Sequence, residues 1–197
     1  MEELNLLEES EIKNRTIEKL VLEDAVLHLI DFQNVKMVDC KILHSNVEHI
    51  DFNQVTFENC NFSNTTFENS RFYDCKLINC KLEGCNFIDC AIYSVTLQET
   101  NANYSNFTNT TIKNDKFQNT SLRNSYFQEN QLKSVVLEKV DLTQAQFFKT
   151  KLQNIDLSHA NIEGIAISLD DIKGAIIDEL QVLDLLYLIG VKLKNKW

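Results

Sequence analysis

Large apolar residues recur at every fifth position through most of the chain. The series begins at Ile12, ends at Ile177 and fills 34 consecutive positions. Apart from Ala102 these positions hold only Ile, Leu, Phe, Met or Val, and of the twelve Phe residues only Phe148 falls outside the series. A register that runs this far without a break predicts a repeat architecture rather than independent helices and strands.

A period of five fits neither regular secondary structure. In an α-helix, five residues advance a side chain by about 140° beyond a full turn, so the apolar positions would spread around the axis. In a flat strand, an odd spacing would send successive apolar side chains to opposite faces. A backbone that turns a corner every five residues keeps all of them inward. The pattern therefore predicts a solenoid with sides of five residues.

The positions that flank each apolar centre support this prediction. Asn or Gly often stands two residues after the centre, and both tolerate the positive φ that a tight corner requires. Small residues stand two positions before it, where a strand would also point inward. All six cysteines occupy that small position: Cys40, Cys60, Cys75, Cys80, Cys85 and Cys90. We interpret them as buried thiols, with metal or redox chemistry as the alternative.

The number of sides in one coil follows from which residues stack. With four sides, residues twenty apart lie above one another, about 4.8 Å apart as in any parallel ladder. At that spacing one column contains five consecutive aromatic residues: Phe67, Phe87, Phe107, Phe127 and Phe147. We therefore expect an all-β, quadrilateral parallel β-helix of about eight coils, a rod roughly 40 Å long.

The repeat resembles the pentapeptide repeat family over about residues 12–177. The family's order is a small residue, a polar residue, Leu or Phe, and two polar or turn residues. Examples in this chain are Cys60-Asn61-Phe62-Ser63-Asn64 and, with Ile at the centre, Ala160-Asn161-Ile162-Glu163-Gly164. The resemblance implies a right-handed quadrilateral β-helix. Around it we expect an N-terminal tail or cap over residues 1–11, and a C-terminal helix with a short strand over residues 178–197.

Residues 178–189 are predicted to form the C-terminal helix. Asp178 with Gln181 three residues later fits a capping box, and Gly190 is suited to end the helix. Because the segment is apolar nearly all round, we expect one side to close the last coil and the other to form a homodimer. Capping alone is the alternative. The expected dimer residues are Leu180, Leu183, Leu185, Leu186, Tyr187 and Ile189.

The C-terminal sequence from Ile167 to Lys194 is similar to that of bacterial Qnr-like pentapeptide repeat proteins. That resemblance implies a dimeric acidic rod, similar to B-DNA in width and charge, which binds DNA gyrase or topoisomerase IV and can protect it from quinolones. Because the register here never slips, the projecting loops of the plasmid-borne members are not expected, and drug protection stays open. The alternative function is a structural or regulatory interaction module whose partner is unrelated to DNA.

Acidic side chains outnumber basic ones, 29 to 19, which gives a net charge of −10. This charge disfavours nucleic acid and membrane phosphates as partners. Columns of residues twenty apart place several carboxylates around one side and corner, and an ordinary solvated face is the alternative to a binding stripe. The expected stripe contains Asp31, Glu48, Asp51, Glu68, Asp74, Asp89 and Glu129.

Catalytic motifs and ligand sets are not recognisable in the sequence. We expect no enzyme activity, no cofactor and no metal, because the His residues lie at scattered outward positions and no phosphate-binding glycine loop occurs. Without an apolar run of membrane length or a signal peptide, we expect a cytoplasmic protein. Three positions break the repeat rule: Ala102 leaves a small centre, and Asp115 and Asn130 place polar groups inward. There we expect a distorted wall, or hydrogen bonds from backbone donors to Asp115.

Overall fold

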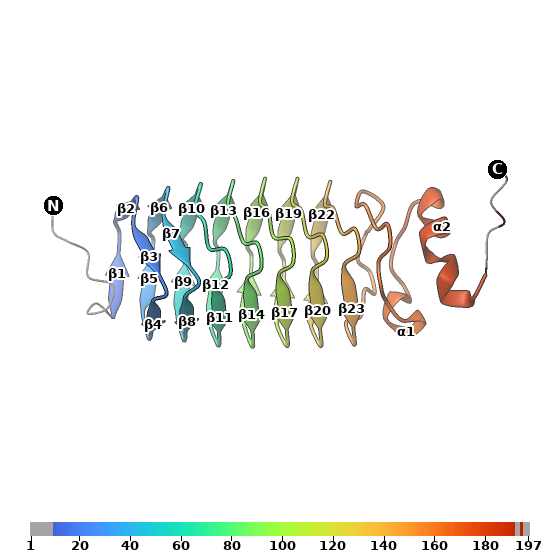
Figure 1. Cartoon of the computed structure of the whole chain (residues 1–197), viewed down its shortest axis with the longest axis horizontal. Helices are drawn as coiled ribbons and strands as arrows, with labels where there is room; N and C mark the ends of the chain where they lie inside the picture. Colours follow the sequence, from blue (N-terminus) through green and yellow to red (C-terminus); the bar gives the residue numbers. More distant parts are fainter. Residues whose placement is uncertain (1–9, 192–193, 195–197) are drawn as a thin grey trace.

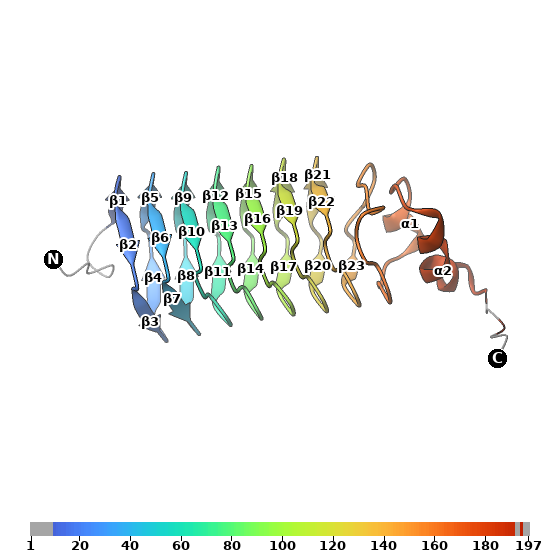
Figure 2. The ribbon, with the colours of Figure 1, turned by 90° about the horizontal axis from the view of Figure 1, so that it is seen from above.

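The chain folds into a straight rod of stacked coils (Figure 1). The computed structural model describes residues 10–191 and residue 194. The N-terminal tail or cap expected over 1–11 and the short strand expected near the C-terminus fall mostly outside this range. The first strand and the last helical segments lie at opposite ends of the rod, and a view from above shows the same straight stacking (Figure 2).

Strands of three residues form the sides of each coil, and partners in neighbouring coils are parallel and twenty residues apart. We label the four sides A to D in chain order. Side A is a seven-stranded sheet of β1 (Glu11–Lys13), β5 (Asp31–Gln33), β9 (Asp51–Asn53), β12 (Arg71–Tyr73), β15 (Ala91–Tyr93), β18 (Thr111–Lys113) and β21 (Gln131–Lys133). Side B contains β2 (Thr16–Glu18), β6 (Lys36–Val38), β10 (Thr56–Glu58), β13 (Lys76–Ile78), β16 (Thr96–Gln98), β19 (Lys116–Gln118) and β22 (Val136–Glu138).

The other two sides complete the quadrilateral. Side D contains β4 (Val26–His28), β8 (Asn46–Glu48), β11 (Thr66–Glu68), β14 (Asn86–Ile88), β17 (Asn106–Thr108), β20 (Tyr126–Gln128) and β23 (Gln146–Phe148). Side C begins with β3 (Val21–Glu23) and β7 (Lys41–Leu43) and continues as isolated bridges from Lys41 to Asn161. The predicted four-sided all-β solenoid is confirmed. Its sheets give about seven regular turns rather than eight, because the last coils stack without named strands.

Corners repeat two residues after the apolar centres, and from Asn14 to Asn154 the backbone at every such position has positive φ. Asn fills many of these positions because it adopts the left-handed conformation at little cost. On side C the corner closes with a hydrogen bond from the Thr65 amide to the Phe62 carbonyl, 3.0 Å long. Gly84 occupies one such corner, where an added Cβ would lie 2.5 Å from Oδ1 of Asn64. Close stacking of corners thus favours glycine there.

Apolar centres fill the axis of the rod, as the period predicts. The aromatic column on side D stacks in parallel: the rings of Phe87 and Phe107 lie 4.9 Å apart at 4°, and those of Phe127 and Phe147 lie 4.6 Å apart at 3°. Phe148 points outward and is 58% exposed. Burial of such rings contributes roughly 25 cal/mol per Å² of apolar area, so the column is a main source of stability.

The six cysteines are free and buried at the small inward position. Cys75 Sγ donates to the carbonyl of Phe52 at 3.3 Å and to that of Tyr73 at 3.4 Å. Burial raises the pKa of the Cys75, Cys85 and Cys90 thiols to about 12, so they stay protonated. Within the described residues no group of three or more His, Cys, Asp or Glu could hold a metal ion. The thiols therefore pack as core residues.

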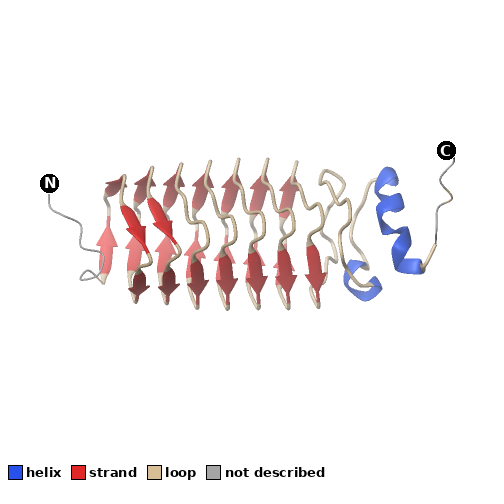
Figure 3. Cartoon of the chain, viewed as in Figure 1, coloured by secondary structure: helices blue, strands red, loops and turns tan. Residues whose placement is uncertain are grey.

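The C-terminal end closes the rod with helical segments (Figure 3). These are α1 (Leu169–Ile172), η1 (Glu179–Gln181), α2 (Val182–Leu185) and η2 (Leu186–Ile189). The predicted capping box of Asp178 and Gln181 is present, and Gly190 ends the run with φ of 70°. Helix α1 lies inside the range expected to be β-helix, because Ser168 caps it by accepting from the Asp171 amide. The coil nevertheless continues, since Leu157 N–H donates to Ile176 O at 2.8 Å.

The irregular positions leave the walls regular. Strands β18 and β19 keep the twenty-residue register on both sides. The expected backbone donor to Asp115 is present: Val95 N–H donates to Oδ1 at 2.5 Å. Asn130 is satisfied in the same way by the Thr110 amide at 2.8 Å. Tyr104 does not fill the space beside Ala102, because it lies on a corner and is exposed.

Candidate functional site: an acidic groove near the N-terminal end

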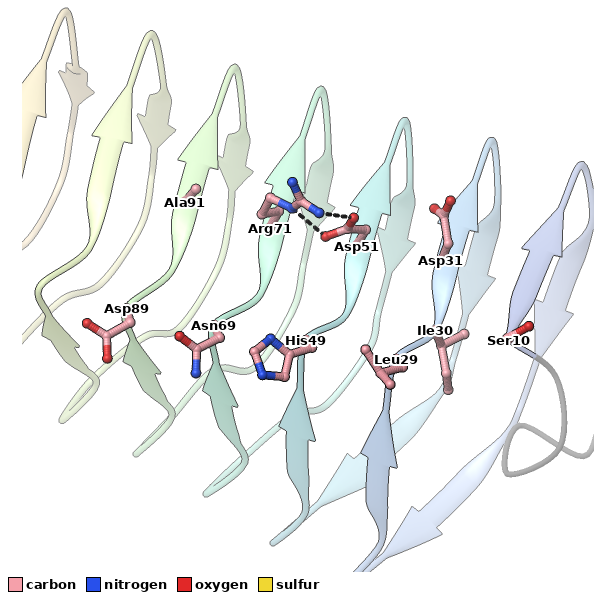
Figure 4. Close-up of a pocket in the computed structure, with 10 residues that line it drawn as sticks. All are labelled: Ser10, Leu29, Ile30, Asp31, His49, Asp51, Asn69, Arg71, Asp89 and Ala91. Atoms are coloured by element: carbon pink, nitrogen blue, oxygen red, sulfur yellow. Dashed lines mark hydrogen bonds and ion pairs between the residues drawn. The ribbon is translucent and has the colours of Figure 1, made fainter.

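A groove of about 610 Å³ runs over the corner between sides D and A, in the half of the rod nearer the N-terminus (Figure 4). Two rows of side chains border it. One row follows the corner itself, and the other follows the first outward position of side A. The lining residues are Ser10, Leu29, Ile30, Asp31, His49, Asp51, Asn69, Arg71, Asp89 and Ala91.

The repeat geometry places these rows. Leu29, His49, Asn69 and Asp89 are all corner residues with φ between 50° and 56°, so their side chains project outward at the same place in successive coils. On side A, strand pairing aligns the outward side chains of successive coils in the same way, so Asp31 lies beside Asp51. Consecutive coils therefore present the groove as a linear array with a step of about 4.8 Å.

One of the three carboxylates in the groove, that of Asp51, forms an ion pair with a guanidinium. Arg71 donates from Nε and Nη2 to the two oxygens of Asp51, at 2.7 and 2.6 Å, as Figure 4 shows. Asp51 raises the pKa of the guanidinium, which keeps the pair ionised. Asp31 accepts from Gln33 Nε2 at 2.6 Å, and Asp89 accepts from Asn109. Three carboxylates and one guanidinium leave the groove with a net charge of −2.

Glu48 and Glu68 extend the acidic surface onto side D. They are register partners on β8 and β11, so two like charges lie directly side by side. Such pairs destabilise a sheet modestly. Glu48 has two imidazoles near it, His28 Nδ1 at 3.6 Å and His49 Nε2 at 3.4 Å. Both imidazoles lie close to the Glu48 carboxylate, so the four side chains form one polar cluster.

Two predicted stripe residues do not join the groove. Asp74 is the corner residue after β12, at the edge of side A away from Asp89, since its amide bonds to Tyr93 O. Glu129 shares the corner of Asp89 but lies two coils further on and forms an ion pair with Lys149 at 2.9 Å. The groove and its extension therefore contain Asp31, Glu48, Asp51, Glu68 and Asp89.

Sequence reasoning missed the partners that shape this surface. Arg71 is twenty residues after Asp51, so the column arithmetic contained the signal for their pairing. The register places Leu29 at a corner and Ala91 at an outward position, but it carried no signal that they line a groove. On side B, Lys36 and Lys116 form ion pairs with Glu58 and Glu138, so the basic charge there is partly neutralised.

A second surface lies at the C-terminal end. Leu180, Leu183 and Tyr187 fall at helical spacing on one face, and Leu180 is 73% exposed. Ile189 is also exposed and Leu186 is half-buried. Leu185 is partly buried and packs against the core of its own chain, so it presents less apolar surface than Leu180 or Leu183.

Polar bonds hold this cap to the last coils. Gln181 Nε2 donates to the carbonyls of Leu157 and Ala160, at 2.8 and 2.7 Å. Tyr187 donates its hydroxyl hydrogen to Ile165 O at 2.6 Å, so the ring has one bound end although it is half exposed. The cap is therefore fixed, with an apolar face turned away from the rod.

In the part of the chain that the structure describes, no helix is long and apolar enough to cross a membrane.

The fold and these two surfaces define a parallel β-solenoid with sides of five residues and an exterior suited to binding. The model of the pentapeptide repeat region matches residues 50–127 and 70–147. Together with the repeat from Ile12 to Ile177, this match shows that the chain belongs to the pentapeptide repeat family. No curated protein matches the sequence significantly.

Several solved structures are similar to this chain. Full-length QnrB1, described as a plasmid-mediated fluoroquinolone resistance protein, has 15% identity and a TM-score of 0.47, with 89% of this chain and 100% of that chain covered. HetL from the cyanobacterium Nostoc, described as involved in heterocyst differentiation regulation, has 16% identity and a TM-score of 0.44, with 88% and 89% covered. At such values the similarities carry no function over to this chain.

Proposed function

We propose that this protein is a non-catalytic DNA mimic that binds a bacterial type II topoisomerase, DNA gyrase or topoisomerase IV, through the acidic groove and its extension on side D. Basic residues that normally hold DNA phosphates would meet carboxylates of the rod. The resemblance of the C-terminal sequence to Qnr-like proteins supports the choice of partner, and QnrB1 is itself described as a fluoroquinolone resistance protein. Modulation of the enzyme or its protection from quinolones would follow from this contact.

The observation that carries the proposal is the set of carboxylates on both sides of the corner between sides D and A. Asp31 with Asp51, and Glu48 with Glu68, are one coil step of about 4.8 Å apart. For comparison, one DNA strand carries one phosphate per about 3.4 Å of helix axis. Asp31, Glu68 and Asp89 have no ion-pair partner among the described residues, so their charge is available to a cation. A straight, rigid rod presents them without an ordering cost.

A homodimer through the C-terminal face forms part of the proposal. Leu180, Leu183 and Ile189 are exposed apolar residues on a cap that is fixed to the rod. A second copy is a partner of matching chemistry because such a face loses water contact when it pairs with itself. Since the groove lies toward the opposite end, the dimer would carry one acidic surface at each far end.

The test is a gyrase supercoiling assay with and without a quinolone, across a series of salt concentrations. We expect inhibition or protection at micromolar protein that weakens steeply with salt, because the contact exchanges charges for counterions. The triple variant Glu48→Lys, Glu68→Lys and Asp89→Lys should abolish the effect while the rod stays folded.

A matched control has the same change in charge on another side. Glu23, Glu83 and Glu163 share one exposed column on side C, and their triple replacement by Lys should leave the effect on gyrase nearly unchanged. Equal losses in both triple variants would mean that net charge alone matters and the groove is not the contact. Absence of any effect from the unaltered protein on either enzyme would remove the proposal.

An interaction module for a different partner is the second candidate. The apolar lining residues Leu29 and Ala91 favour it, because a pure phosphate mimic has no use for them. A partner that inserts an apolar side chain between carboxylates would bind with a weak salt dependence. Pull-down followed by a salt series distinguishes the two candidates, since only the electrostatic contact dissociates at moderate salt.

A further inference from the structure

The small inward position works as a hydrogen-bond donor along most of the rod. At this position a thiol, hydroxyl or amide repeatedly donates to the backbone carbonyl 23 residues earlier, in the preceding coil. Thr110 Oγ1 donates to Phe87 O at 3.1 Å, for example, and Asn130 Nδ2 donates to Phe107 O at 2.9 Å. The same bond is made by Cys40, Cys60, Thr65, Ser70, Cys75, Cys80, Cys85, Cys90, Thr100, Ser105, Thr120 and Thr150.

Asp115 occupies this donor position with a side chain that donates only when protonated. It is 1% exposed, and its Oδ1 accepts from the Val95 amide at 2.5 Å. Its Oδ2 is buried and has no hydrogen-bond partner among the described residues. An ionised carboxylate there would be surrounded by the valines that flank it in its column, Val95 and Val135. Such a charge is costly because nothing replaces its lost hydration.

The surroundings supply no compensating cation. The ionisable residues on the strands packed around Asp115 are Tyr93 on β15, Lys113 on β18, Lys116 on β19, Lys133 on β21 and Glu138 on β22, and β16 carries none. All of these lie at outward positions. The inward titratable group in the same column is the thiol of Cys75, two coils away, whose pKa of about 12 keeps it neutral. Burial raises the pKa of Asp115 to about 7, although the Val95 amide opposes the shift.

We propose that Asp115 is a proton-controlled lock within the rod. In its neutral form Oδ2–H donates to the carbonyl of Ile92, the acceptor that the repeat places 23 residues earlier, and the coils from β15 to β22 are held closed. Loss of that proton to solvent removes the donor and leaves an uncompensated charge inside the core. The middle of the rod then loosens as the pH rises through neutrality, which is the opposite of ordinary acid denaturation.

Asp115→Asn tests this lock, because an amide at the position can make both bonds without titrating, as Asn130 does. The ratio of the unfolding constants of the unaltered protein and this variant should rise by up to about tenfold per pH unit, from the ordinary carboxyl range to neutrality, and then become level. Asp24→Asn, the same change at an exposed corner, should give a ratio without this rise. A ratio for Asp115→Asn that is independent of pH would overturn the proposal.

A measurement on the unaltered protein keeps the test valid even if the variant folds poorly. In a ¹³C NMR titration of the aspartate carboxyl carbons, one signal should titrate near neutrality, far above the others. Hydrogen exchange at the Val136 amide, which donates to Asp115 O at 2.9 Å, should lose protection over the same transition. Aspartate carbons that all titrate in the ordinary acidic range would show that Asp115 is ionised in the core, and the lock would not exist.

Discussion

Replacement of Phe107 by Ala should be among the most destabilising single changes in the rod. The ring is 2% exposed and stacks on Phe87 and on Phe127, both at a centroid distance of 4.9 Å. Loss of a buried Phe with the cavity it leaves costs about 3–5 kcal/mol. Each stacked aromatic pair contributes about 0.5–1.5 kcal/mol beyond burial. The two stacks therefore account for about 1–3 kcal/mol of the total.

Phe107→Leu separates burial from stacking. Leucine occupies many other centres of this repeat, so the side chain is compatible with the site and keeps most of the buried area. This variant should lose only the two stacks, about 1–3 kcal/mol of the free energy of unfolding. Phe148→Ala is the matched control, because Phe148 is the neighbouring aromatic that faces solvent. Its change should stay within about 0.5 kcal/mol.

Chemical denaturation monitored by circular dichroism measures these free energies. Because long repeat arrays can unfold in stages, hydrogen exchange of the Tyr126 amide, which donates to Ser105 O at 2.9 Å, gives the local value beside the column. If Phe107→Leu costs nothing measurable, the stacks add nothing beyond burial. If Phe107→Ala costs no more than Phe148→Ala, the ring is not part of a closed core, and the explanation of the repeat fails.

Other predictions follow from the core thiols, the groove and the cap. Cys75, Cys85 and Cys90, whose thiol pKa values are raised to about 12, should resist iodoacetamide in the native protein at mildly basic pH and react fully in denaturant, as mass spectrometry of the alkylated chain would show. Arg71→Ala should change thermal stability by less than about 1 kcal/mol, because the pair is exposed, yet strengthen any effect on gyrase at low salt by freeing Asp51; a weaker effect would contradict the assignment of the groove. Gln181→Ala should cost about 1–3 kcal/mol in denaturant unfolding, because it leaves two buried carbonyls unpaired. A chain truncated after Ile177 should be monomeric by light scattering, whereas the full chain should be dimeric; equal masses would show that the helical cap does not mediate association.

The fold could be predicted from the sequence because every level of the repeat agrees. The five-residue period fixes which side chains face inward, and the aromatic column at a spacing of twenty fixes the number of sides. Asp178, Gln181 and Gly190 also located the C-terminal helical segment. Helix α1 was not predicted, because its apolar residue Ile172 keeps the five-residue register of the β-helix. Its capping pair, Ser168 and Asp171, was the local signal that could have revealed it.

The acidic surface was only partly predictable, for a geometric reason. Columns of residues twenty apart give the neighbours along the rod, so Asp31 with Asp51 and Glu48 with Glu68 were placed correctly. Where a residue lies around the coil depends on which corner it occupies. Asp74 occupies the corner after side A, but it was grouped with residues at the corner before side A. Ion pairing depends on the conformations in which long side chains reach from one coil to the next. The spacing of twenty residues placed Arg71 beside Asp51, but the two hydrogen bonds between them emerged only from the structure.

Regular stacking also determines how much a single buried polar residue can change the stability of the rod. In a globular core an unsatisfied group can be relieved by local rearrangement, whereas each coil here is held by ladders to the coils on both sides. Asp115 cannot move outward without breaking the bond from Val136 N–H to its own carbonyl. The remaining way to lower the cost is to take up a proton, which agrees with the elevated pKa of about 7. The repeat that makes the rod rigid thus makes its stability sensitive to one carboxyl group.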